Sequence, residues 1–271
     1  MDLFWLHYNR SMNLVDKELF YKARNSGDTQ FYSDLLHTSM LAMGFRFGDT
    51  SRDDIRGLQH GVKSSLIHRS LRLLVEYGCV KLDASPSSIH FLLILGDLEF
   101  GVGKTGSAWF YCGFASLLLR HGLHKEPSGT QLLHSDECQA LLATIVACTA
   151  YDWLFSRWLD RPTNLRVSDL ECLHATMKGH FSELASLPLP PTPSPPESTI
   201  EELGRKTLLD LLLFTNKVLE LMECAPSTTL YLSAISMENE LEKYWSDCLV
   251  PELRWTGNTA SVASPTFYLM Q

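Results

Sequence analysis

The chain has 271 residues, of which 45% are hydrophobic, and this is the composition of a globular protein with a substantial buried core. Lys and Arg number 23 against 31 Asp and Glu, so the formal net charge is -8. A protein that binds a nucleic-acid backbone by itself needs a surplus of cationic side chains. The excess of acidic residues therefore disfavours a DNA-binding fragment. No run of 18 apolar residues marks a membrane span.

Seven cysteines are spread widely along the chain, at positions 79, 112, 138, 148, 172, 224 and 248. None of them forms the C-x-x-C pair that structural zinc sites use, and their odd number disfavours a dense disulfide framework. We therefore expect reduced, mostly buried thiols and neither a metal ion nor another cofactor in this chain.

Apolar residues recur at helical spacing, whereas hairpin turn signals are scarce. In chain order, the spacing predicts helices over 31–47, 64–78, 89–100, 107–121, 135–158, 200–223 and 228–245. Ser85 and Pro86 are typical of a helix start, because serine caps the first turn and proline suits its first position. Gly78 is the last residue of one predicted helix, Gly101 and Gly122 each follow another, and all three are expected to end these helices. The sequence thus predicts an all-α fold, a multi-helix domain of antiparallel helical hairpins.

The clearest compositional break is Pro188–Pro196, where six of nine residues are proline. Such a stretch is not helical and is typical of an extended linker. We therefore expect a helical N-terminal part over 1–187, a proline-rich linker loop over 188–199, and a C-terminal helix pair of the same domain over 200–271. Residues 264–271 begin an apolar segment with no room for a helix, so the domain is expected to be truncated there.

The segment Gly101–Thr105 resembles a phosphate-binding loop, since Gly103 and Lys104 are followed by a threonine. A phosphate loop also requires a glycine five residues before Gly103, where this chain has Leu98. We therefore predict a turn between helices, with Lys104 in solvent and no catalytic residue. The alternative is a small helical enzyme with a nucleotide or thiol site around Gly101–Thr105.

Four charged residues flank the aromatic end of the predicted helix 135–158 and the Arg-Pro turn at Pro162: Asp152, Arg157, Arg161 and Asp169. We expect these side chains to form a partly buried, hydrogen-bonded network that fixes the turn. The alternative is a set of exposed charges, each of which contributes less than about 1 kcal/mol.

Several blocks of the sequence, taken in order, resemble the fungal-specific transcription factor domain, which is the regulatory region that follows a six-cysteine zinc cluster. Leu41–Phe47 is similar to the family's L-A-x-G-x-R-F helix. Gly106–Gly113, with Trp109 inside it, looks like the family's G-x-A-W-x-Y-x-G pattern. Smaller blocks are Leu3-Phe4-Trp5 at the start and Leu123-His124-Lys125, which stands where the family has G-L-H-R.

A further block runs from Asp152 through Asp160-Arg161-Pro162 to Asp169 and resembles the family's signature D-R-x-x-x-x-x-x-G-R-P-x-x-L-x-x-x-D. Asp160 stands where the family usually has glycine, so the chain departs from the family's pattern at that turn. The resemblance covers residues 2–174 well and 200–255 more loosely.

This resemblance implies an all-helical regulatory domain that controls transcription by RNA polymerase II in the nucleus, for example of a metabolic or secondary-metabolite gene set. Family members contact DNA through their zinc cluster, often as dimers, so DNA binding and zinc are expected only through a separate cluster domain. The partners implied are transcriptional co-regulators or a small-molecule effector, together with a second copy of the chain as a homodimer. Neither an enzyme nor a membrane protein is implied.

Overall fold

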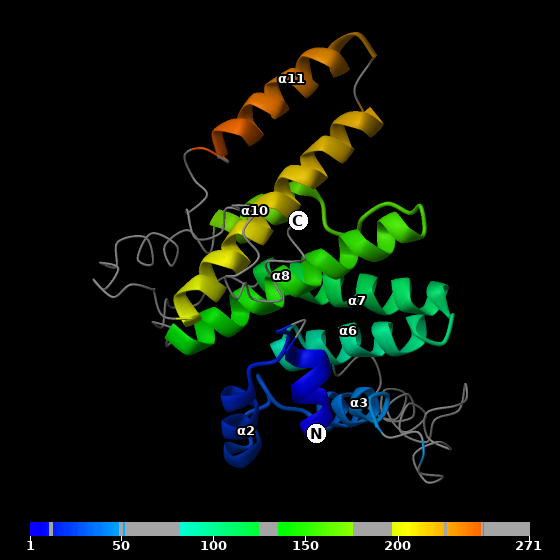
Figure 1. Ribbon diagram of the computed structural model, residues 1–271, viewed down its shortest axis with the longest axis vertical. Coiled ribbons are helices and arrows are strands. Elements are labelled where there is room, and N and C mark those ends of the chain that lie inside the picture. The colour runs from blue at the N-terminus through cyan, green and yellow to red at the C-terminus, as the bar shows by residue number, and fades with distance from the viewer. Residues whose placement is uncertain are drawn as a thin grey trace. The chain divides into compact units, whose positions relative to one another are not determined.

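The computed structural model describes residues 1–10, 13–48, 51, 82–124, 135–175, 197–224, 227–244 and 246. The chain divides into two compact units, Met1–Leu165 and Arg166–Gln271. Within the described ranges the regular structure is helical throughout, which confirms the predicted all-α fold (Figure 1). None of the described helices is long and apolar enough to cross a membrane.

The first unit begins with the π-helix η1 (Phe4–Asn9), followed by α2 (Lys17–Ser26) and α3 (Asp34–Phe45). The carboxylate of Asp16 caps α2 by accepting a hydrogen bond from the backbone N–H of Leu19 at 2.8 Å. The hydroxyl of Ser33 caps α3 in the same way. Helix α3 confirms the predicted helix 31–47, whereas helical spacing did not predict η1 or α2.

Helix α6 (Pro86–Phe100) is the centre of the first unit, with thirteen of its fifteen residues buried. It packs against α3, α7 (Thr105–His124) and α8 (Ser135–Trp158), and Figure 1 shows α6 between α3 and α7. The hydroxyl of Ser85 accepts from the backbone N–H of Ser88 at 3.3 Å, and Pro86 occupies the first turn. The predicted start of this helix is therefore confirmed. Because α6 is apolar on every side, its neighbours bury it all round.

Helix α8 has the bounds that the spacing predicted, but the predicted end of α7 was wrong, because the helix continues through Gly122 to His124. A Cβ at Gly122 would lie 3.0 Å from the Cβ of Ala84, which is tighter than ordinary van der Waals contact. The glycine thus permits a close approach of the chain rather than ending the helix.

The second unit contains a helical segment at 167–175, α10 (Glu197–Cys224) and α11 (Ser227–Lys243). Helices α10 and α11 pack together as the predicted C-terminal pair. The carboxylate of Asp210 on α10 accepts hydrogen bonds from His174 Nε2 at 2.9 Å, from Lys206 Nζ at 2.8 Å and from the hydroxyl of Tyr244 at 2.9 Å. This one carboxylate links three segments of the unit.

Three predicted segments lie outside the described residues: the helix 64–78, the proline stretch Pro188–Pro196 and the final segment 264–271. The proposed division of the chain at 188–199 stays a prediction, although residues 197–199 already belong to α10.

Candidate functional site

The carboxylate of Asp152 on α8 holds the loop that follows the helix. It accepts hydrogen bonds from the backbone N–H groups of Asn164 and Leu165, both at 2.8 Å, and from the side-chain amide of Asn164 at 2.7 Å. Asp152 is only 2% exposed. Burial raises the pKa of its carboxyl, while the hydrogen bonds from Asn164 and Leu165 act in the opposite direction. Asp152 is thus a buried anchor for the loop.

The same loop meets α7 at Gly113 and Trp109, two of the residues singled out from the sequence. A Cβ at Gly113 would lie 3.0 Å from the side-chain nitrogen of Asn164, so a larger residue there would have to displace the Asn164 side chain. One turn earlier on α7, the guanidinium of Arg161 lies over the Trp109 ring, 4.6 Å from its centroid, which is a cation–π contact. Two blocks that carry the family resemblance therefore contact each other.

Asp160 adopts a left-handed backbone conformation, with φ of 50°. Helix α8 ends here, and the backbone N–H of Arg161 donates a hydrogen bond to the carbonyl of Ser156 at 2.8 Å, as is common at helix ends. The hydroxyl of Ser156 donates to the carbonyl of Pro162 at 3.1 Å. A left-handed position favours glycine, and an aspartate tolerates it better than most residues. Asp160 therefore occupies a position that suits glycine, the residue that the family's pattern has there.

The four charged residues of the predicted network have different surroundings. Asp152 and Arg161 make the contacts described above within the first unit. Asp169 belongs to the second unit, where its carboxylate accepts a hydrogen bond from the backbone N–H of Arg166 at 2.9 Å. A single network that also includes Arg157 stays a prediction.

The segment after α6 is a tight turn, in which Gly103 has φ of 82°. The backbone N–H of Lys104 donates to the carbonyl of Glu99 at 3.0 Å, and α7 begins at Thr105. The ammonium of Lys104 lies 3.1 Å from the carboxylate of Glu99, whose side chain is 4% exposed. Lys104 was predicted to be a solvated side chain; it is 39% exposed and also pairs with the buried Glu99 carboxylate.

Arg46, the arginine of the L-A-x-G-x-R-F block, packs against the same turn. Its guanidinium donates to the carbonyl of Leu98 in the last turn of α6, where a cation complements the helix dipole. A Cβ at Gly101 would overlap the guanidinium, at 1.8 Å from Nη1. The turn is therefore filled by an arginine of this chain.

Among the described cysteines, Cys112 and Cys148 are buried and Cys172 is exposed. Burial raises the pKa of Cys112, and it raises the pKa of Cys148 to about 12. Protonated, buried thiols are poor nucleophiles. The described residues also contain no group of three or more His, Cys, Asp or Glu side chains that could hold a metal ion.

Sequence reasoning missed three buried polar contacts between helices. Tyr8 of η1 donates to Asp97 of α6 at 2.6 Å, and Tyr151 of α8 donates to the same carboxylate oxygen. His90 Nε2 of α6 lies 2.9 Å from the hydroxyl of Thr144 on α8. Tyrosine, aspartate and histidine within otherwise apolar helices were the available signal, but spacing does not reveal which of them meet.

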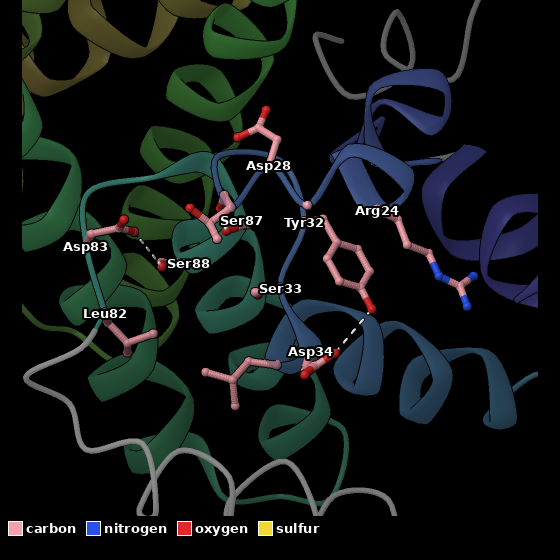
Figure 2. A pocket seen from close by; sticks show the side chains of 12 residues that line it. Arg24, Asp28, Tyr32, Ser33, Asp34, Leu82, Asp83, Ser87 and Ser88 are labelled. Atoms are coloured by element: carbon pink, nitrogen blue, oxygen red, sulfur yellow. Dashed lines mark hydrogen bonds between the residues drawn. The ribbon is translucent and has the colours of Figure 1, made fainter. Parts of the chain in front are cut away.

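A pocket of about 440 Å³ lies where α2 ends and where α3 and α6 begin (Figure 2). Its wall includes the buried side chains of Leu35, Ser87 and Ser88, whereas Asp28 and Asp34 are exposed. The remaining lining residues are Arg24, Gly27, Thr29, Tyr32, Ser33, Leu82 and Asp83. This volume is within the usual range of small-molecule sites, about 300–1,000 Å³.

The family model of the fungal-specific transcription factor domain matches residues 1–190. The chain belongs to that family. It is also 22% identical, over 297 aligned positions, to an uncharacterized transcriptional regulatory protein of Schizosaccharomyces pombe. The alignment covers 100% of this chain and 44% of that relative, so the chain spans less than half of the relative's length. No solved structure matches.

Membership in this family confirms the resemblance deduced from the sequence. The family is one of transcription factor domains and not of enzymes, so the alternative of a small helical enzyme around Gly101–Thr105 is set aside. The contacts described above show what several family blocks do in this chain: Arg46 fills the turn after α6, and Gly113 and Trp109 receive the loop that follows α8.

Proposed function

We propose that the chain is the regulatory domain of a transcription factor that acts in the nucleus on transcription by RNA polymerase II, and that a separate zinc cluster reads the DNA. The observation that carries this proposal is the family match over residues 1–190. The S. pombe relative, which is named as a transcriptional regulatory protein, also supports the proposal. A metabolic or secondary-metabolite gene set is the proposed target.

The physical role we propose is that of a switch between two helical packings. A ligand or partner shifts such an equilibrium only by the difference between its affinities for the two states. The partners proposed are a small-molecule effector or a transcriptional co-regulator, and a second copy of the chain in a homodimer.

The experiment is to delete the encoding gene in its own host and to sequence the RNA. We expect a limited set of transcripts to change and to return when the intact gene is restored. Restoration with an Asp152→Ala gene, which weakens the loop anchor, is expected to return them less completely. Unchanged transcripts under conditions in which the gene is expressed contradict the proposal.

A second experiment tests whether DNA reading belongs to a separate domain. With a net charge of -8, the purified chain is expected to bind duplex DNA weakly and without sequence preference. Fluorescence anisotropy at physiological salt, with a chelator present, measures this. Selective binding of one promoter fragment over a scrambled duplex contradicts it.

A further inference from the structure

One side of α7 is open to solvent and is apolar. Phe110 is 62% exposed and Leu117 is 47% exposed, and Phe114 between them is partly exposed. His121 follows one turn later and is exposed as well. A helix at a protein surface normally presents charged and polar side chains to water. We name this side, made of residues 110, 114, 117 and 121, the α7 stripe.

The α7 stripe has the spacing of a seam between paired helices. Its residues follow one another at intervals of four, three and four, which is the d-a-d-a pattern of a coiled coil. At this spacing the side chains stay on one line along the helix, and a second helix with the same pattern fits its side chains between them. The α7 helix of a second copy of the chain necessarily has that pattern.

The charges of the chain favour α7 for contact between two copies. The net charge of -8 makes two copies repel each other. Helix α7 contains no Asp or Glu, and from Thr105 to Leu119 it has no charged residue at all. In the part of the chain that the structure describes, every other α-helix contains at least one acidic residue. Two α7 helices therefore oppose each other without bringing carboxylates of their own together.

The two edges of the stripe indicate that the paired helices run in the same direction. At one edge lies Trp109, with the exposed Arg161 guanidinium over its ring, and Arg120 follows on this edge about three turns later. The other edge, with Ser107 and Tyr111, is uncharged. In a two-fold dimer, parallel helices place the arginine edge of one copy beside the uncharged edge of the other. Antiparallel helices would place both arginine edges on the same side, so the parallel arrangement keeps the positive groups apart.

We propose that the α7 stripe is a contact surface between two copies of this chain, related by a two-fold axis that runs parallel to α7. Phe110, Phe114 and Leu117 of one copy then lie against the same three residues of the other. The inference rests on the proposed function, in which a second copy is one of the partners, and names the surface that this partner uses. A contact along so short a stretch of helix is smaller than the about 800 Å² per partner of a standard interface, so we expect a dissociation constant in the micromolar range.

The test is analytical ultracentrifugation of the purified chain at about 1–300 μM, a range that brackets a micromolar dissociation constant. We expect a reversible equilibrium between monomer and dimer. Phe110→Glu and, separately, Phe110→Lys place like charges opposite each other, so each is expected to weaken self-association about tenfold or more. An equimolar mixture of the two variants pairs opposite charges and is expected to restore the dimer.

The charged variants are expected to fold, because Phe110 is largely exposed, and circular dichroism checks this. Leu117→Glu and Leu117→Lys form a second pair with the same expected results, used if a Phe110 variant unfolds. A parent chain that stays monomeric throughout the range overturns the proposal. A mixture of oppositely charged variants that associates no better than either variant alone overturns it as well.

Leu154→Glu is the matched control. Leu154 on α8 is as exposed as Leu117, at 47% each, and lies outside the α7 stripe. Its substitution is expected to leave self-association unchanged. An equal loss in Leu154→Glu means that copies associate through exposed apolar side chains in general, and it overturns the proposal.

These measurements need no transcription assay. A chain that stays monomeric leaves the proposed regulatory function standing, and a reporter gene that does not respond to the chain leaves the contact between copies standing.

Discussion

Asn164 donates two hydrogen bonds to the carboxylate of Asp152, one from its backbone N–H at 2.8 Å and one from its side-chain amide at 2.7 Å. The pair connects the loop after α8 to the interior of the first unit. Because the side chain of Asn164 also lies against Gly113, the loop, α8 and α7 are fixed at one place.

Replacing Asp152 by alanine is expected to lower the free energy of unfolding by about 3–5 kcal/mol, since the N–H groups of Asn164 and Leu165 lose a buried acceptor. Urea unfolding measures the loss. Glu171→Ala is the control, because the carboxylate of Glu171 is 53% exposed where it pairs with Lys217 at 3.1 Å, and its loss is expected to stay below about 1 kcal/mol. A similar, small effect of both substitutions contradicts the anchor role.

Lys104→Ala is expected to lower stability by about 1–3 kcal/mol, because it removes the ammonium that pairs with the buried Glu99 carboxylate. The expected loss is not larger, because the lysine side chain is 39% exposed and solvent screens its charge. Adding Glu99→Gln to Lys104→Ala removes the unpaired charge and is expected to recover part of the loss. A double-mutant cycle by chemical denaturation measures the coupling, and additive effects of the two substitutions mean that the ion pair is unimportant.

Because the turn at Asp160 is left-handed, we expect two substitutions there to have different effects on stability. Asp160→Val is expected to cost about 1–2 kcal/mol, because a β-branched residue resists φ of 50°. Asp160→Gly removes that conflict, so it is expected to be neutral or stabilising. Thermal melts of both variants test this, and a valine variant that melts with the parent shows that the turn has another conformation in solution.

His90 makes stability depend on pH. Burial lowers its pKa from 6.5 to about 3, so the folded protein keeps this imidazole neutral where the unfolded chain protonates it. The unfolded state then binds more protons, and stability is full above pH 6.5 and falls as the pH drops toward 3. The slope contributed by this group approaches about 1.4 kcal/mol per pH unit between these two pKa values.

The readout is the difference between the parent and His90→Gln, which keeps an N–H for the Thr144 hydroxyl but does not titrate. Denaturant unfolding at several pH values between 4 and 7 is expected to show a shallower dependence in the variant. Parallel curves for the two proteins mean that His90 is charged, or accessible, in the folded state.

The helices could be predicted wherever local chemistry determines them. Ser85 and Pro86 specify the start of α6, and the spacing of apolar residues specifies both ends of α8. Gly122 was misread, because a glycine that ends a helix and one that permits the close contact with Ala84 look the same in a sequence. The π-helix η1 has a different period from the one that was sought.

The candidate site was harder to predict because its contacts join residues far apart in the chain. Asp152 and Arg161 were singled out, but the partners Asn164 and Trp109 depend on how α7 and the loop meet. Glu99 and Lys104 were close enough to be found, since an acidic residue in the last turn of an apolar helix stands five residues before a lysine. The pocket is formed by the ends of three helices, and the spacing of residues along the sequence does not show that these ends meet.

We propose that this chain regulates transcription without reading DNA itself. The most direct measurement joins the chain to a heterologous DNA-binding domain and records the output of a reporter gene that carries the matching operator in a fungal cell. The account predicts that the fusion changes reporter output relative to the DNA-binding domain alone, and that Asp152→Ala weakens the change at equal protein level. An intact fusion that is present in the nucleus at the same level and leaves the reporter unchanged contradicts it.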